Sequence, residues 1–95
     1  MVVGICCLNL RISENNSLKG KRRILKSMIE RVTNKFNVSI AEVGDHDLWQ
    51  SSQIGFCMVS NNRRFVNSAL DKIIDFIEEM NIAEIIKSDI EIINL

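Results

Sequence analysis

The stretch that decides the fold is residues 2–12, which read VVGICCLNLRI. The run is rich in β-branched and apolar residues and becomes polar on one side only near its end, which is typical of a β-strand. The even-numbered positions form one apolar face. Val3, Ile5 and Cys7 make the beginning of the other face apolar as well. A strand that is apolar on both sides is expected in the centre of a sheet.

The rest of the chain alternates between the helical and the strand period. Two amphipathic stretches are predicted helices, and each follows a side chain that can cap a helix N-terminus, Ser17 for the first and Asn61 or Asn62 for the second. The predicted elements are strands at 2–12, 38–43, 54–60 and 90–95, and helices at 18–37 and 63–80.

This order predicts one domain that spans residues 1–95, because a chain of this length has room for a single core. We expect an α+β fold of the ferredoxin-like βαββαβ type. In such a sandwich a four-stranded antiparallel sheet carries two helices on one face and leaves the other face open.

The cysteines and the apolar runs bear on the cellular setting. Cys6, Cys7 and Cys57 have no metal-ligand spacing, so we expect reduced thiols. The apolar start lacks a basic flank and is too short to cross a bilayer. We therefore expect a cytoplasmic protein without a membrane partner.

Charge is unevenly distributed although the chain is formally neutral. Residues 1–40 carry eight Lys or Arg against two Glu, a net +6, whereas residues 41–95 carry four basic and ten acidic residues, a net −6. Such an asymmetry indicates either a charged partner or neutralisation between the two halves of the fold.

Most of the positive charge lies on the first predicted helix. Four of its cations recur at i, i+3, i+4 and i+7 and span about 100° of the helical wheel beside the apolar stripe. We name them the basic ridge; they are Lys19, Arg22, Arg23 and Lys26. A row of cations like this can neutralise successive phosphates. The alternative is an ordinary solvated face in which Lys26 pairs with Glu30.

The second predicted helix carries an acidic counterpart, the acid ridge, made of Asp71, Asp75, Glu78 and Glu79. It could solubilise the surface, meet a basic partner, or lie against the basic ridge within the monomer. The last arrangement would weaken the case for nucleic-acid binding.

Signs of an active site are missing from the sequence. His46 lies between Asp45 and Asp47, but no second histidine, nucleophile or metal-spaced cysteine accompanies it. The chain also lacks a Gly-rich phosphate loop. We therefore predict no enzyme, no cofactor, no metal and no small-molecule ligand.

Trp49 and the open sheet face form a second group of candidate residues. Trp49 lies in the predicted loop between the second and third strands, where an exposed indole could stack on a base or anchor a protein interface. Val3 and Ile5 are expected on the open face, which is apolar enough to bury a second copy of the chain.

Three stretches of the sequence resemble the YlxP-like family of small bacterial proteins. They are SLKGKRR at 17–23, FNVSIAEV at 36–43 and DLWQ at 47–50 with the strand after it. The resemblance implies a ferredoxin-like domain of unknown function. Genes of the family are often found near those for transcription and translation factors, including ribosome-binding factor A. The resemblance therefore also implies a bacterial cytosolic protein with a role around ribosome assembly. Lys19, Lys21, Arg22 and Trp49 match motif positions, and the family assigns them no role.

Gly20 departs from the family pattern, which usually has Glu at this position. The reciprocal capping box is lost, and a glycine inside a helix costs about 1 kcal/mol relative to alanine. We therefore expect the first turn of the first helix to fray.

Two functional hypotheses follow. The first is a non-enzymatic binding protein that contacts RNA or the small ribosomal subunit through Lys19, Lys21, Arg22, Arg23 and Lys26. The alternative is a protein-interaction or homodimerisation module that uses the open sheet face, with Val3 and Ile5, together with Trp49.

Overall fold

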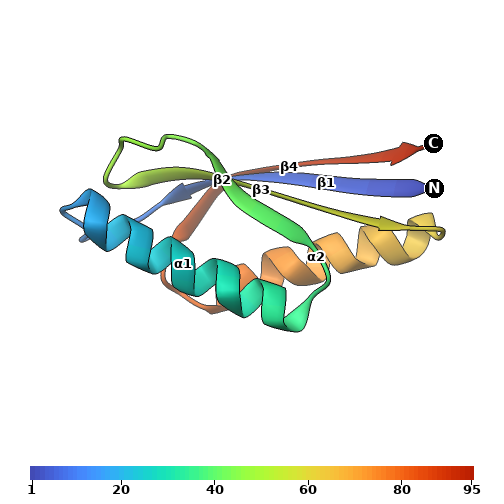
Figure 1. Ribbon diagram of the computed structural model, residues 1–95, viewed down its shortest axis with the longest axis horizontal. Helices are drawn as coiled ribbons and strands as arrows, with labels where there is room; N and C mark the ends of the chain where they lie inside the picture. The colour runs from blue at the N-terminus through green and yellow to red at the C-terminus, as the bar shows by residue number, and fades with distance from the viewer.

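The computed structural model of the protein describes residues 1–95 and confirms the predicted βαββαβ order (Figure 1). The elements are β1 (Val2–Arg11), α1 (Leu18–Lys35), β2 (Ser39–Gly44), β3 (Ser51–Ser60), α2 (Arg63–Glu79) and β4 (Glu84–Asn94). The strands form one antiparallel sheet in the order β2-β3-β1-β4. The ferredoxin-like fold is therefore confirmed, and β1 lies inside the sheet between β3 and β4.

Both helices lie along the same face of this sheet (Figure 1). The even-numbered side chains of β1 point toward them and are buried, as the alternation of a strand requires. Fourteen buried apolar residues form the core. They are Val2, Cys6, Leu8, Leu10 and Ile12 from the first strand and its end, Leu25, Met28 and Val32 from α1, Ile54 and Phe56 from β3, and Val66, Leu70, Ile73 and Ile77 from α2.

No helix covers the opposite face of the sheet (Figure 1). The odd-numbered side chains of β1 point to this face, because successive side chains of a strand alternate between the two faces. Val3 pairs with Val59 of β3, and Ile5 pairs with Cys57. Val59 is 63% exposed and Ile5 37% exposed. The open face predicted for Val3 and Ile5 is therefore present.

Two strands begin earlier than predicted: β3 at Ser51 instead of 54, and β4 at Glu84 instead of 90. The cause is β1, which is ten residues long and presents backbone partners on both sides along its full length. A bulge between Asn9 and Leu10 lets the polar beginning of β4 stay paired as far as Arg11 and Glu84. Neither α1 nor α2 combines the length and the apolar composition that a membrane-spanning helix requires.

Candidate nucleic-acid interface

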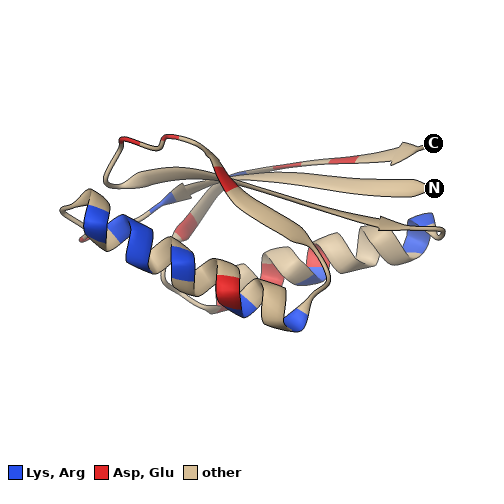
Figure 2. Ribbon diagram, in the orientation of Figure 1, with Lys and Arg blue, Asp and Glu red and all other residues tan.

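The basic ridge is exposed along the N-terminal half of α1. Lys19, Arg22, Arg23 and Lys26 are all exposed, and Figure 2 shows basic residues repeating along this helix. The two ion pairs of the structure, Lys21–Glu42 and Lys87–Asp89, include none of them. The Lys26–Glu30 pair considered from the spacing does not form. The four ridge cations are therefore free to meet an external anion.

The acid ridge of α2 does not neutralise the basic ridge. All four of its carboxylates are exposed and none joins an ion pair. The two helices meet at the C-terminal end of α1, where the rings of Phe36 and Phe76 pack edge to face with centroids 5.5 Å apart. The ammonium of Lys35 lies 4.6 Å from the centroid of Phe76 at the same place.

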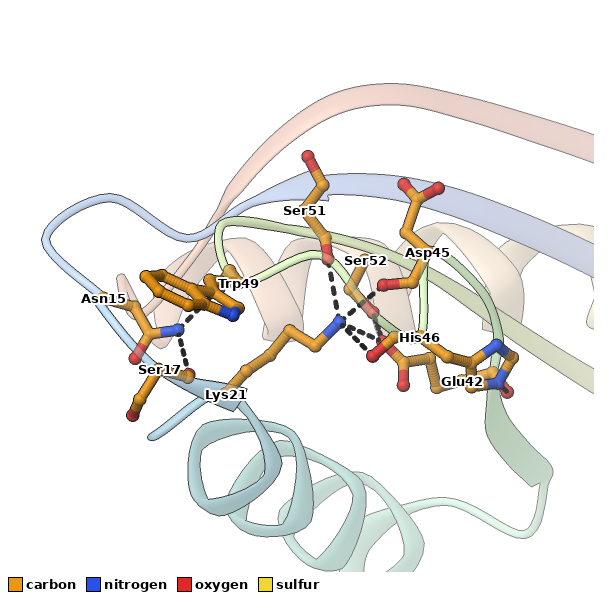
Figure 3. Close-up of polar contacts among 9 residues, drawn as sticks. All are labelled: Asn15, Ser17, Lys21, Glu42, Asp45, His46, Trp49, Ser51 and Ser52. Carbon is orange, nitrogen blue, oxygen red and sulfur yellow. Dashed lines mark hydrogen bonds and ion pairs between the residues drawn. The ribbon is translucent and has the colours of Figure 1, made fainter. Parts of the chain in front are cut away.

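Lys21 does not belong to this exposed surface, which corrects its assignment as a phosphate-binding residue. Its side chain is 1% exposed and points inward from α1 (Figure 3). The Nζ atom lies 3.0 Å from Oε2 of Glu42. It also donates to the carbonyl oxygens of Asp45 (2.6 Å), His46 (3.3 Å) and Ser51 (3.1 Å).

The phase of the helix explains this burial. Lys21 precedes Leu25, Met28 and Val32 by 4, 7 and 11 residues, so it shares their buried face. On the helical wheel it lies about 160° from Lys19 and at least about 100° from every other cation of the ridge. A cation in this position needs partners that replace water, and the acceptors at the end of β2 and the start of β3 supply them.

Glu42 completes the buried pair from β2. Its Oε2 accepts a hydrogen bond from Ser52 Oγ at 2.7 Å, and Ser52 is fully buried. Partial burial alone would raise the pKa of Glu42. The hydrogen bonds from Ser52 and Lys21 and the charge of Lys21 outweigh it, so the pKa lies below its ordinary value. No buried side-chain nitrogen or oxygen in the structure lacks a hydrogen-bond partner.

Asn15 connects the β2–β3 loop to the start of α1. Its Nδ2 donates to the carbonyl oxygen of Ser17, the N-cap residue, and to the carbonyl oxygen of Trp49. Gln50 returns the contact by donating from Nε2 to the carbonyl oxygen of Asn15 at 3.0 Å. Two hydrogen bonds through Asn15 therefore connect the backbone of Trp49 to Ser17, the N-cap residue of α1 (Figure 3).

The first turn of α1 is closed, so the structure does not show the fraying expected from Gly20. Ser17 Oγ accepts from the Gly20 amide at 3.0 Å, and the Ser17 carbonyl accepts from the Lys21 amide at 3.1 Å. A Cβ at position 20 would run into Oδ1 of Asn15. Gly20 therefore leaves room for the side chain of Asn15. The hydrogen bonds from Lys21 to the β2–β3 loop hold the turn in place of a capping box.

Trp49 is 53% exposed and its neighbour Leu48 is 52% exposed. Together with Asp47, Gln50 and Ser51 they line an open surface hollow of about 530 Å³. The chain contains no second tryptophan and no tyrosine. This loop thus displays the largest aromatic side chain of the protein at the surface.

His46 lies in the same loop and is exposed. Its Nε2 is 3.3 Å from the carbonyl oxygen of Glu42. No group of three or more His, Cys, Asp or Glu side chains is arranged to hold a metal ion. The histidine therefore lies at the surface of the loop, in contact with the backbone of β2.

The open sheet face contains a separate, apolar hollow of about 370 Å³. Ile5, Val43 and Cys57 are among its lining residues, and Val3 lies nearby in the register of β1. Sequence reasoning missed Val43, which is 55% exposed and covers Gly55 on the neighbouring strand. The three cysteines are unpaired, and burial raises the pKa of the Cys6 thiol to about 11.

Comparison with known proteins agrees with the predicted family. The chain is 39% identical over 77 residues to the uncharacterized protein YlxP of Bacillus subtilis (strain 168), covering 81% of this chain and 84% of that protein. It is also similar to the crystal structure of a putative chlorite dismutase, with a TM-score of 0.52 and 16% identity. That similarity covers 99% of this chain and 45% of the other, so the chain spans less than half of that protein. At this identity the likeness shows the fold alone. Residues 3–90 match the family described as proteins of unknown function (DUF503), and the chain belongs to this family.

Proposed function

We propose that this protein is a non-enzymatic RNA-binding protein whose basic ridge contacts the phosphates of ribosomal RNA. One observation carries the proposal: Lys19, Arg22, Arg23 and Lys26 are exposed on one side of α1 and have no partner within the protein. A polyanion that lies along the helix can meet all four and release its condensed counterions.

The position of the ridge along α1 supports an anionic partner. The first turn of the helix contains no acidic residue, and Lys19 lies in it. Cations at a helix N-terminus are repelled by the positive end of the helix dipole, whereas phosphates are attracted to both. This charge pattern weakens the free helix slightly and favours a bound anion.

The expected gene context of the YlxP-like family directs the choice of partner. Genes of this family are expected near those for translation factors and ribosome-binding factor A. The small ribosomal subunit is therefore the first RNA-containing particle to test.

Cosedimentation with small ribosomal subunits and their precursors, at low and at moderate salt, tests this proposal. We expect retention that falls with salt and is lost in Arg22→Glu/Arg23→Glu. The matched control is Arg63→Glu/Arg64→Glu, which changes the net charge equally at an exposed site on α2. Retention that ignores salt, or equal losses in the two double variants, would contradict the proposal.

A second candidate function, homodimerisation through the open face, is favoured by a different observation. Large apolar side chains on this face remain exposed, among them Ile5 (37%), Val43 (55%) and Val59 (63%). A second copy that covered them would remove this surface from water.

Sedimentation equilibrium tests this candidate. It predicts a mass that rises with concentration and falls to that of the monomer in Ile5→Lys, while Phe65→Lys, an exposed apolar site on α2, leaves the mass unchanged. A strictly monomeric wild type would contradict it.

A further inference from the structure

We infer that Trp49 is a stacking platform for an unpaired base of the RNA strand whose phosphates lie on the basic ridge. This inference rests on the proposed function and specifies its ligand: a single-stranded segment, not a continuous duplex. The bases inside a duplex are stacked on each other, so only an unpaired base can present its face to an indole.

The first support is the placement of Trp49 beside the ridge. The Nδ2 of Asn15 binds the carbonyl oxygens of both Ser17 and Trp49, so the loop backbone is held at the N-terminal end of α1. This is the end at which Lys19, Arg22 and Arg23 lie. A strand that follows the ridge to the N-terminal end of α1 would therefore approach the loop that carries Trp49.

The second support is the way the loop is held. Lys21 binds the carbonyl oxygens of Asp45, His46 and Ser51, which lie on both sides of Trp49 in the chain. Gln50 donates from its side chain to the carbonyl oxygen of Asn15, and its own carbonyl oxygen accepts from the amide of Ile12. The backbone that carries the indole is thus ordered before binding, which lowers the entropy lost when a base docks.

The third support is the exposure of the indole. More than half of Trp49 remains accessible, although packing inside the domain is the usual outcome for a tryptophan. The one aromatic pair of the structure, Phe36 with Phe76, lies at the other end of α1. The ring faces of Trp49 are therefore not used for aromatic stacking within the protein.

The fourth support is the difference in charge between the loop and the ridge. Asp47 lies beside Trp49 in the lining of the surface hollow, and no cation lines it. A phosphate would be repelled there, whereas a base is uncharged and its N–H groups can donate to a carboxylate. The ridge is consequently suited to phosphates and the loop to a base.

Fluorescence offers a direct test, because Trp49 is the only tryptophan and the chain contains no tyrosine. The protein is titrated with an oligo(U) RNA of about eight nucleotides and, in a separate experiment, with a duplex RNA that has the same number of phosphates. We expect saturable quenching of the indole by the single strand and little change with the duplex.

Anisotropy of labelled RNA measures binding independently of the indole. Trp49→Ala should weaken oligo(U) binding by roughly 5- to 150-fold and leave duplex binding within about twofold, because one stacked base is lost and the phosphate contacts remain. Trp49→Phe should restore a large part of the affinity. Phe65→Ala removes a similarly exposed apolar side chain from α2, outside this loop, and should have little effect.

The outcomes separate this inference from the proposed function. Salt-sensitive RNA binding that is lost in Arg22→Glu/Arg23→Glu but indifferent to Trp49→Ala would overturn the stacking platform and leave the ridge intact. Absence of RNA binding in the wild type would overturn both, and would leave a protein partner as the ligand of the loop.

Discussion

One helix of this protein carries two kinds of cation. Lys21 and the basic ridge lie within the same eight residues of α1, yet Lys21 is 1% exposed and bound to four acceptors, whereas the four ridge cations are exposed and unpaired. The difference is one of helical phase, because Lys21 shares the face of Leu25 and Met28. The number of cations in a stretch of sequence therefore says little about function until the face of the helix on which each cation lies is known.

The difference between Lys21 and the basic ridge predicts the largest effect for substitution of Lys21, the inner cation. Lys21→Met should lower the free energy of unfolding by about 2–4 kcal/mol, since it leaves the carboxylate of Glu42 without its counter-ion and removes the donor of three carbonyl groups. This is somewhat below the usual value for a buried pair because the Glu42 side chain is 19% exposed.

Urea denaturation measures this effect, and Lys19→Met is the matched control on the exposed face. The control should change stability by less than about 0.5 kcal/mol. Equal losses in the two variants would show that the inner and outer cations do not differ in role.

The next largest effect is expected for substitutions in the basic ridge, and it is an effect on RNA affinity. Arg22→Glu/Arg23→Glu should weaken RNA binding at low salt by at least about tenfold, because two phosphate contacts become repulsive. Its urea midpoint should stay close to that of the wild type, because neither side chain has a partner in the fold. A large loss of stability would mean that these arginines are structural after all.

A smaller effect of opposite sign is expected at the first turn. Lys19→Glu should raise the free energy of unfolding by about 0.3–1 kcal/mol at low salt, because it places a negative charge at the positive end of the helix dipole. The same change should weaken RNA binding. Thermal unfolding at two salt concentrations measures the gain, and a gain that salt does not reduce would rule out the electrostatic explanation.

The last effect is the pH dependence of the stability that the Lys21–Glu42 ion pair contributes. The pKa of Glu42 is lowered in the fold from an ordinary 4.5, so its contribution to stability is complete above that value and is lost as pH falls through the lower, folded pKa. The difference in urea midpoint between wild type and Glu42→Gln should therefore be constant near neutral pH and shrink below about pH 4.5. A difference that does not change down to acid pH would contradict the ion pair.

Residue patterns predicted most of the fold because its decisive features are periodic. The doubly apolar run of β1 placed it inside the sheet, and the stripes of α1 and α2 gave two helices that cover one face. The start of β4 was missed because residues 84–89 include Glu84, Lys87 and Ser88 and do not resemble a buried strand. They are paired because β1 extends far enough to pair with them, which is a property of the sheet and not of the segment.

The candidate site was predictable only in part. The exposed ridge follows from spacing, and the same spacing places Lys21 on the apolar stripe, so its burial had a signal in the sequence. The partners of Lys21 had none, because three of them are backbone carbonyls brought together by the turn between β2 and β3. The contact between Asn15 and Trp49 spans 34 residues and likewise depends on the finished fold.

The salt dependence of RNA affinity tests the central claim most directly. If the four ridge cations each meet a phosphate of a single strand, log K should fall with log salt with a slope of about −2.8. The slope should decrease in size to about −1.4 in Arg22→Gln/Arg23→Gln, since two contacts are removed. An unchanged slope in this variant, or an affinity that does not respond to salt, would show that the basic ridge is not where RNA binds.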